Sequence, residues 1–278
     1  MRANFSLTSG WMNRSVSSAS AIAISIGAAA VIVLANITGL GQVRLAPPGN
    51  SRTEGHRTTS TTREHIRQAI ASVGVLLVRN GGPGSGQQVW PRGSAVVVRK
   101  DGIIATNLHV VTQDNSGKPF EEIYFALPDE KHPSWLSQSQ YRVRVLLASQ
   151  RYDLALLEIL PDGSGQLESP SRQFPAIQLG DSRHAKILDS IAVIGYPETG
   201  GTTVTANLGV VEGTDPVGDW IKTDARLIHG NSGGAVVDDD GKLIGIPTKI
   251  VLDDQDRRTY GAVGFLRPSY LVGSLLER

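Results

Sequence analysis

Short runs of apolar and β-branched residues recur along most of this chain and constrain its fold more than any other feature. Turn-forming residues, mainly Gly, Pro, Asp and Asn, separate the runs, which is the pattern of β-strands joined by tight turns. A stretch rich in Pro, Gly and Ser at 160–174 divides them into two series. Many short strands at close spacing favour barrels or a sandwich. The predicted strands are 75–78, 94–98, 103–106, 122–126, 141–147, 154–159, 190–194, 202–211, 220–223, 234–237, 242–250 and 260–265.

Helical patterns are confined to the two ends of this β-rich region. Apolar residues recur at helical spacing from Thr62 onward, at Ile66, Ile70 and Val73, and predict a short helix there. Residues 268–276 predict a final helix, because their leucines fall on one side. With 31 glycines and 14 prolines the chain suits a turn-rich β protein rather than a helical bundle.

The N-terminal part differs from the rest. No charged residue occurs between Arg14 and Arg44, and a helix of about 20 apolar residues spans a bilayer. We therefore expect a short tail at 1–18, a transmembrane signal anchor at 19–40, a flexible linker at 41–62 and a folded domain at 63–278. A cleaved signal peptide is the alternative, with Val33-Leu34-Ala35 as a small-residue cleavage site.

The membrane orientation follows from two opposing arguments. Arginines are more numerous after the apolar segment than before it, which by the positive-inside rule favours a cytoplasmic domain. Long domains, however, cross the membrane largely regardless of charge. We expect the folded domain on the extracytoplasmic side, periplasmic or extracellular, and secreted if the segment is cleaved.

Composition excludes several kinds of function. A formal net charge of +1 gives no electrostatic basis for nucleic-acid binding. The absence of cysteine excludes disulfides, thiol catalysis and cysteine-ligated metals. The acidic run Asp238-Asp239-Asp240-Gly241 lacks the ligand spacing of a calcium loop and predicts a β-turn. The glycine-rich segment 81–86 lacks the Lys and Ser/Thr of a phosphate loop and predicts a hairpin loop. We expect no metal and no organic cofactor.

The candidate chemistry lies in Gly230-Asn231-Ser232-Gly233-Gly234. Small neighbours let a substrate carbonyl approach the Ser232 hydroxyl, and glycine allows amide groups to turn toward the reacting oxygen. Two candidate partners lie upstream, His109 and Asp153. In α/β-hydrolases the histidine follows the serine, but here the last histidine, His229, precedes Ser232. The order His, Asp, Ser is instead that of the chymotrypsin-like fold.

The segments around these residues resemble a known family, the HtrA/Deg branch of the trypsin-like serine proteases. The similarity lies in 105–111, 152–157, 223–225 and 230–234, and extends to 177–182, 194–197 and 243–246. It covers roughly residues 68–276. The resemblance implies an all-β fold of two six-stranded antiparallel β-barrels with a C-terminal helix, barrel one at about 72–165 and barrel two at about 175–268. No PDZ domain is expected after it.

The resemblance also implies roles for individual residues. Ser232 would be the nucleophile, His109 the general base and Asp153 its orienting partner, with the N–H groups of Gly230 and Ser232 as the oxyanion hole. The implied activity is that of a serine endopeptidase that acts through an acyl-enzyme on unfolded or damaged proteins, in extracytoplasmic protein quality control.

Other readings of these residues stay open. A catalytically silent protease-fold module for binding or chaperoning is the alternative, and a serine esterase on the same fold is a third reading. The physiological substrate, the cleavage-site preference and a homo-oligomeric state also stay open.

Overall fold

The computed structural model describes residues 59–79, 89–113, 117–161, 173–197, 203–252 and 262–278. All of them belong to one compact unit, Gly55–Arg278. The predicted membrane segment at 19–40, most of the predicted linker and the glycine-rich segment 81–86 lie outside these residues. Among the residues that the structure describes, no helix has the length and apolar character needed to cross a bilayer.

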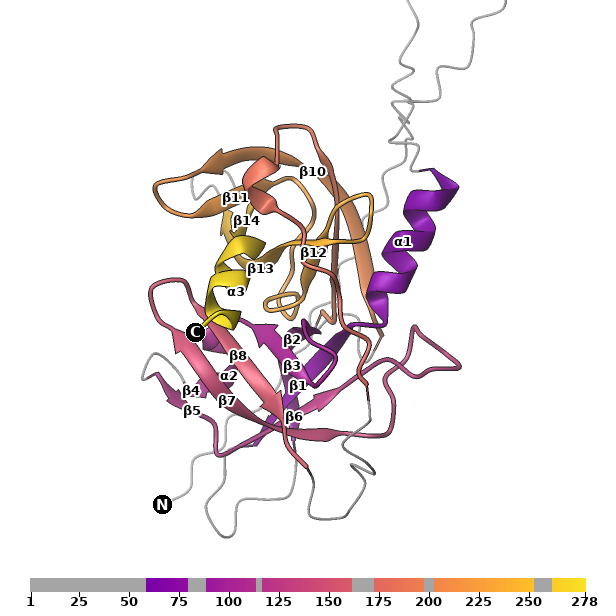
Figure 1. Ribbon diagram of the computed structural model, residues 1–278, viewed down its shortest axis with the longest axis vertical. Coiled ribbons are helices and arrows are strands. Elements are labelled where there is room, and N and C mark those ends of the chain that lie inside the picture. Colours follow the sequence, from indigo (N-terminus) through magenta and orange to yellow (C-terminus); the bar gives the residue numbers. More distant parts are fainter. Residues whose placement is uncertain (1–58, 80–88, 114–116, 162–172, 198–202, 253–261) are drawn as a thin grey trace, which may run out of the picture. The chain divides into compact units, whose positions relative to one another are not determined.

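The first series of strands forms a closed antiparallel barrel (Figure 1). Its strand order is β1-β2-β3-β8-β7-β6, so each strand has a neighbour on both sides and no edge is left unpaired. The predicted bounds of the third, fourth and sixth strands are confirmed. The strands are β1 (Val73–Arg79), β2 (Trp90–Val97), β3 (Ile103–Thr106), β6 (Glu122–Ala126), β7 (Tyr141–Ser149) and β8 (Leu154–Ile159).

The second series closes in the same way, in the order β10-β11-β14-β13-β12-β9 (Figure 1). The prediction of two six-stranded barrels is therefore confirmed. A turn joins β12 to β13 at the acidic run, as expected, with the Gly241 N–H donating to the Asp238 carbonyl at 3.0 Å. The strands are β9 (Ser190–Gly195), β10 (Thr205–Asp215), β11 (Trp220–Thr223), β12 (Ala235–Val237), β13 (Leu243–Leu252) and β14 (Ala262–Pro268).

The helices of the described residues are short. The first, α1 (Ser60–Ile70), begins two residues before the predicted start. Thr59 caps it, because its hydroxyl accepts the N–H of Thr62 at 3.1 Å. The predicted final helix is α3 (Ser269–Leu276). Several small elements were not predicted, since too few residues form them to show a period: α2 (Leu108–Val111), the strand pair β4 (Thr112–Gln113) and β5 (Lys118–Pro119), and the 3-10 helix η2 (Ser182–His184).

Buried apolar side chains form three clusters. One fills barrel one and includes Leu76 and Phe125, and another fills barrel two and includes Leu266. The third contains residues of both barrels and of α1 and α3, among them Val75 and Leu271. Successive side chains of a strand point to opposite faces, so β1 places Val75 in the shared cluster and Leu76 in its own barrel. The two barrels are therefore joined by a common core.

Candidate active site

His109 lies on the one-turn helix α2, which follows β3 of barrel one. The other three residues of this helix are buried, whereas the His109 side chain is 46% exposed. Burial of Leu108, Val110 and Val111 thus fixes the helix to the barrel and leaves the imidazole at the surface.

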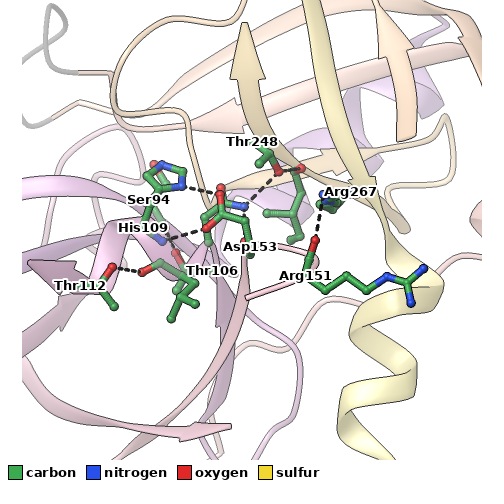
Figure 2. Close-up of polar contacts among 11 residues, drawn as sticks. Ser94, Thr106, His109, Thr112, Arg151, Asp153, Thr248 and Arg267 are labelled. Carbon is green, nitrogen blue, oxygen red and sulfur yellow. Dashed lines mark hydrogen bonds and ion pairs between the residues drawn. The ribbon is translucent and has the colours of Figure 1, made fainter. Parts of the chain in front are cut away.

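Asp153 lies in the turn between β7 and β8 and has a positive φ of 52°. One carboxylate oxygen accepts the His109 backbone N–H at 2.9 Å, and the other lies 2.6 Å from His109 Nδ1 (Figure 2). With a proton on Nδ1, this pairing leaves Nε2 as a hydrogen-bond acceptor. The Asp153 side chain is 30% exposed, so solvent reaches both members of the pair.

Asn107 holds the Asp153 turn in place. Its side-chain amide donates to the Asp153 carbonyl at 2.9 Å and to the Thr248 hydroxyl at 3.0 Å. The Leu108 N–H also donates to the Asp153 carbonyl, at 3.2 Å. Because Thr248 belongs to β13 of barrel two, the turn of barrel one is tied to both barrels.

Ser232 lies in the loop before β12, with glycines of positive φ on both sides: 96° at Gly230 and 83° at Gly233. Three N–H groups of the loop donate to carbonyls at 3.0 Å: Asn231 to Ile228, Gly233 to Pro247 and Gly234 to Asn231. In the part of the chain that the structure describes, the N–H groups of Gly230 and Ser232 have no hydrogen-bond partner. These two are the donors that the sequence predicted for an oxyanion hole.

Ser94, on β2, fastens this loop to barrel one. Its N–H donates to the Ser232 carbonyl at 2.9 Å, and its hydroxyl donates to the Gly230 carbonyl at 2.7 Å. The same hydroxyl accepts the Tyr196 N–H at 2.8 Å. Thr106 in turn donates its hydroxyl to the Ser94 carbonyl at 2.8 Å (Figure 2). Ser94 of barrel one therefore binds the loop at two of its carbonyls, those of Gly230 and Ser232.

Helix α2 and the serine loop approach the same point of β2. A Cβ added to Gly93 would lie 2.8 Å from Val110 Cγ1 and 3.0 Å from the Ser232 carbonyl oxygen, so only glycine fits between them. The structure thus joins His109 to Asp153 and brings Ser232 to the same junction. Among the described residues, the Ser232 hydroxyl itself makes no hydrogen bond to His109.

Several residues of this site were not predicted: Ser94, Thr106, Thr248 and Arg267. Ser94 and Thr248 read as ordinary strand residues, because their partners are 136 and 141 positions away in the sequence. Arg267 was placed beyond the last strand, which was predicted to end at Phe265. An arginine continuing an apolar strand pattern is the one signal that could have identified it. Among the described residues, no three His, Cys, Asp or Glu side chains gather as a metal site.

Two closed six-stranded barrels with a His–Asp pair at their junction define a trypsin-like peptidase architecture. A model of the trypsin-like peptidase domain matches residues 93–246, more than half of the chain, and the chain belongs to this family. Its relatives include HtrA/DegP-like serine proteases. It is 30% identical over 192 residues to a probable periplasmic serine endoprotease, DegP-like, of Chlamydia pneumoniae, a match that covers 67% of this chain and 34% of the relative.

A second relative is the magnetosome formation protease MamE of Paramagnetospirillum magneticum, 30% identical over 186 residues, with 64% of this chain and 22% of MamE covered. Among solved structures, the serine endoprotease from Yersinia pestis matches with a TM-score of 0.58 and 25% identity, covering 79% of this chain and 66% of that one. The HtrA-type protease AlgW with a decapeptide shares the fold, with a TM-score of 0.57. This chain thus spans about a third or less of the curated relatives that it matches.

Proposed function

We propose that this chain is a serine endopeptidase in which Ser232, His109 and Asp153 form the catalytic triad. The observation that carries the proposal is the pattern of N–H groups in the serine loop. Three of its five amides are engaged, and the two left without a partner in the described structure are those of Gly230 and Ser232. A purely structural turn tends to satisfy its amides, whereas an oxyanion hole needs these two donors free for substrate.

In acylation, His109 Nε2 takes the proton of the Ser232 hydroxyl as the oxygen attacks the carbonyl carbon of the scissile peptide bond. The carbonyl oxygen becomes an oxyanion, which accepts the two free N–H groups. Asp153 keeps the proton on Nδ1 and stabilises the imidazolium. His109 then gives its proton to the leaving amine, the C–N bond breaks, and an ester joins the substrate acyl group to Ser232.

In deacylation, water replaces the amine. His109 takes a proton from the water, whose oxygen attacks the ester carbon, and then returns a proton to the Ser232 oxygen as the C–O bond breaks. The products are a carboxylic acid and the free enzyme. Each donor of the oxyanion hole contributes about 10²–10³-fold to kcat in such sites.

The relatives suggest the biological setting. One is described as a periplasmic serine endoprotease, and another as a protease of magnetosome formation. We infer that the substrates are polypeptides, that the domain acts on the extracytoplasmic side of a membrane, anchored through residues 19–40 or secreted, and that its role is protein quality control.

A catalytically silent binding or chaperone module is the competing function. One observation favours it: in the described structure the Ser232 hydroxyl is not hydrogen-bonded to His109. Resting proteases can hold this contact loosely and tighten it on substrate binding. Chemistry at Ser232 therefore discriminates between the two.

Covalent labelling provides the test. A fluorophosphonate should label the chain, fail to label Ser232→Ala, and label His109→Ala far more slowly, because labelling needs an activated hydroxyl. Hydrolysis of an unfolded protein should fall by about 10³-fold or more in both variants. The control is Ser274→Ala on the exposed side of α3, which should behave as the unaltered chain. Equal labelling of Ser232→Ala, or no labelling of the unaltered chain, would refute the proposal; a substrate ester cleaved without any peptide cleavage would favour an esterase.

A further inference from the structure

Arg267 on β14 is an arginine with only 7% of its surface exposed. Its Nη1 donates to the carbonyls of Gly218 and Asp219, at 2.8 and 3.1 Å, in the turn before β11. Its Nη2 donates to the Arg151 carbonyl at 3.4 Å, in the turn between β7 and β8 (Figure 2). One guanidinium from barrel two thus binds the backbone of the turn in barrel one that carries Asp153.

Aromatic rings complete the surroundings of this guanidinium. Its Cζ atom lies 3.3 Å from the centroid of the Trp220 ring and 5.6 Å from that of the Tyr152 ring. The side chain of Arg151 covers the same Tyr152 ring at 5.1 Å. Since Tyr152 directly precedes Asp153, Arg267 contacts both residues before the carboxylate. A planar group that donates and stacks at once fits this place, and an ammonium does not.

The charge of Arg267 is not matched by a close partner. Among the described residues, no carboxylate lies within 4.0 Å of it, and its buried Nε has no hydrogen-bond partner. Burial lowers the pKa of the guanidinium, while Asp153, then Asp219 and the hydroxyls of Tyr152 and Tyr270, act in the opposite direction. Arg remains charged, so these groups all face a cation.

We propose that Arg267 is a positioning residue for the His109–Asp153 pair, which fixes the Arg151–Tyr152 backbone so that Asp153 keeps its geometry. The inference rests on the proposed function. Asp153 holds a positive φ of 52°, a conformation that persists in a non-glycine residue when its surroundings impose it. Asn107 fixes the carbonyl side of Asp153, and Arg267 fixes the two residues before it.

If Arg267 served stability alone, its replacement would leave the His109–Asp153 pair unchanged. A buried cation without an ion-pair partner carries a desolvation cost, and its replacement by an apolar side chain of similar volume removes that cost. Arg267→Met therefore need not unfold the protein. Arg267→Lys keeps the charge but loses the planar guanidinium, which both donates to the carbonyls and stacks on the rings. The two variants therefore distinguish an effect of positioning from an effect of charge.

The experiment follows His109 by NMR in the full chain that carries Ser232→Ala, which excludes self-cleavage. The readouts are the downfield resonance of the Nδ1 proton shared with Asp153 and the pH midpoint of the imidazole titration, both identified by their loss in His109→Ala. Arg267→Met and Arg267→Lys are added in turn. The matched control is Arg67→Met, on the exposed side of α1.

If Asp153 is displaced, its hydrogen bond with His109 Nδ1 weakens. The protonated imidazole of His109 is then stabilised less. We expect both Arg267 variants to weaken the downfield resonance and to lower the titration midpoint, while Arg67→Met changes neither. If Arg267 acts only through the electrostatic field of its charge, Arg267→Met raises the midpoint and Arg267→Lys leaves it unchanged. If neither variant changes the resonance or the midpoint of His109, Arg267 has a structural role only. Either result overturns the proposal.

Kinetics with Ser232 restored give the second readout. We expect kcat to fall about tenfold to a hundredfold in both Arg267 variants, with KM nearly unchanged, because misplacing a catalytic group acts on the reacting step. Absence of Ser232-dependent hydrolysis in the unaltered chain would refute the proposed function but not this inference, which the NMR measurements still decide. A rise in KM with kcat unchanged would overturn the inference.

Discussion

The buried side chain of Ser94 connects segments that are far apart in the sequence. Its hydroxyl lies between the Gly230 carbonyl, 136 positions away, and the Tyr196 N–H, 102 positions away. A Cβ on Gly195 would lie 3.1 Å from this hydroxyl oxygen, one on Gly234 would lie 3.3 Å from the Ser94 Cβ, and one on Gly233 would lie 2.2 Å from the Ser94 carbonyl oxygen. At the scale of single residues, the site therefore depends on small side chains, which let one hydroxyl reach the backbone of two distant segments.

Replacing Ser94 tests this dependence. Ser94→Ala leaves a buried carbonyl and a buried N–H without a partner, and each such group costs about 1–3 kcal/mol. We expect the free energy of unfolding to fall by about 2–6 kcal/mol for the two groups together and kcat to fall with it, because the Gly230 carbonyl belongs to the loop that we propose forms the oxyanion hole. Urea unfolding and steady-state kinetics on one preparation measure both.

Ser274→Ala serves as the control for this substitution. Its hydroxyl donates to the Tyr270 carbonyl at 3.0 Å on an exposed part of α3, and surface changes of this kind usually alter stability by less than about 0.5 kcal/mol. Unchanged stability and kcat in Ser94→Ala would contradict the structural account of the loop.

The sequence predicts which residues would react but not which residues would support them. His109, Asp153 and Ser232 carry a recognisable residue type in a recognisable local pattern and order. Ser94 and Arg267 carry none, because a buried serine or arginine acquires its role from partners in another barrel. Such contacts form only when the two barrels fold and pack against each other.

At the scale of elements, the seam between β1 and β6 closes barrel one. Arg79 pairs with Glu122 across this seam, and the Tyr124 hydroxyl donates to the same carboxylate at 2.7 Å. The hydrogen bond from Tyr124, followed by that from Arg79, lowers the pKa of Glu122 below its ordinary value of 4.5. The folded seam therefore favours the charged carboxylate.

The sign of the pH dependence follows from this shift. A carboxylate whose pKa is lowered by folding contributes stability above its ordinary pKa, and the contribution is lost as pH falls through the lowered value. We expect Glu122→Gln to destabilise the protein near neutral pH and to differ little from the unaltered chain in acid. Urea unfolding measured across this pH range, with Glu121→Gln as the adjacent exposed control, checks it. A difference that persists unchanged into acid would contradict the prediction.

The sequence predicts those strands and helices that are long enough to show a periodic pattern of apolar residues. The strands β3, β6, β8 and β11 have the expected bounds. The ends of β10 and β14 lie four and three residues beyond the predicted ends, because cross-strand hydrogen bonds extend strands past their apolar residues. Helix α2 was missed because one turn is too short to show a helical period.

At the scale of the molecule, the two barrels share one buried cluster. It draws Val75 and Val96 from barrel one, Ile194 and Leu243 from barrel two, and also side chains from α1 and α3. Unfolding either barrel alone would expose the face of the other. The cost of that exposure, about 25 cal/mol for each Å² of apolar surface, opposes a state in which only one barrel is folded.

We therefore expect residues 55–278 to unfold in a single cooperative transition. Calorimetry of the full chain carrying Ser232→Ala should give a calorimetric enthalpy close to the van't Hoff enthalpy. Two resolved transitions, one for each barrel, would show that the shared cluster does not couple them.

The sequence by itself determined the strand pattern, the division into two series and the residues capable of acid–base and nucleophilic chemistry. These depend on local periodicity and on chain order, which a linear sequence contains. Only the tertiary structure decided that, among the described residues, the two amides at Gly230 and Ser232 have no partner, that Ser94 binds the loop, and that Arg267 contacts the turn of Asp153. Each of these depends on contacts between the two barrels, which come into existence when both have closed around their common core.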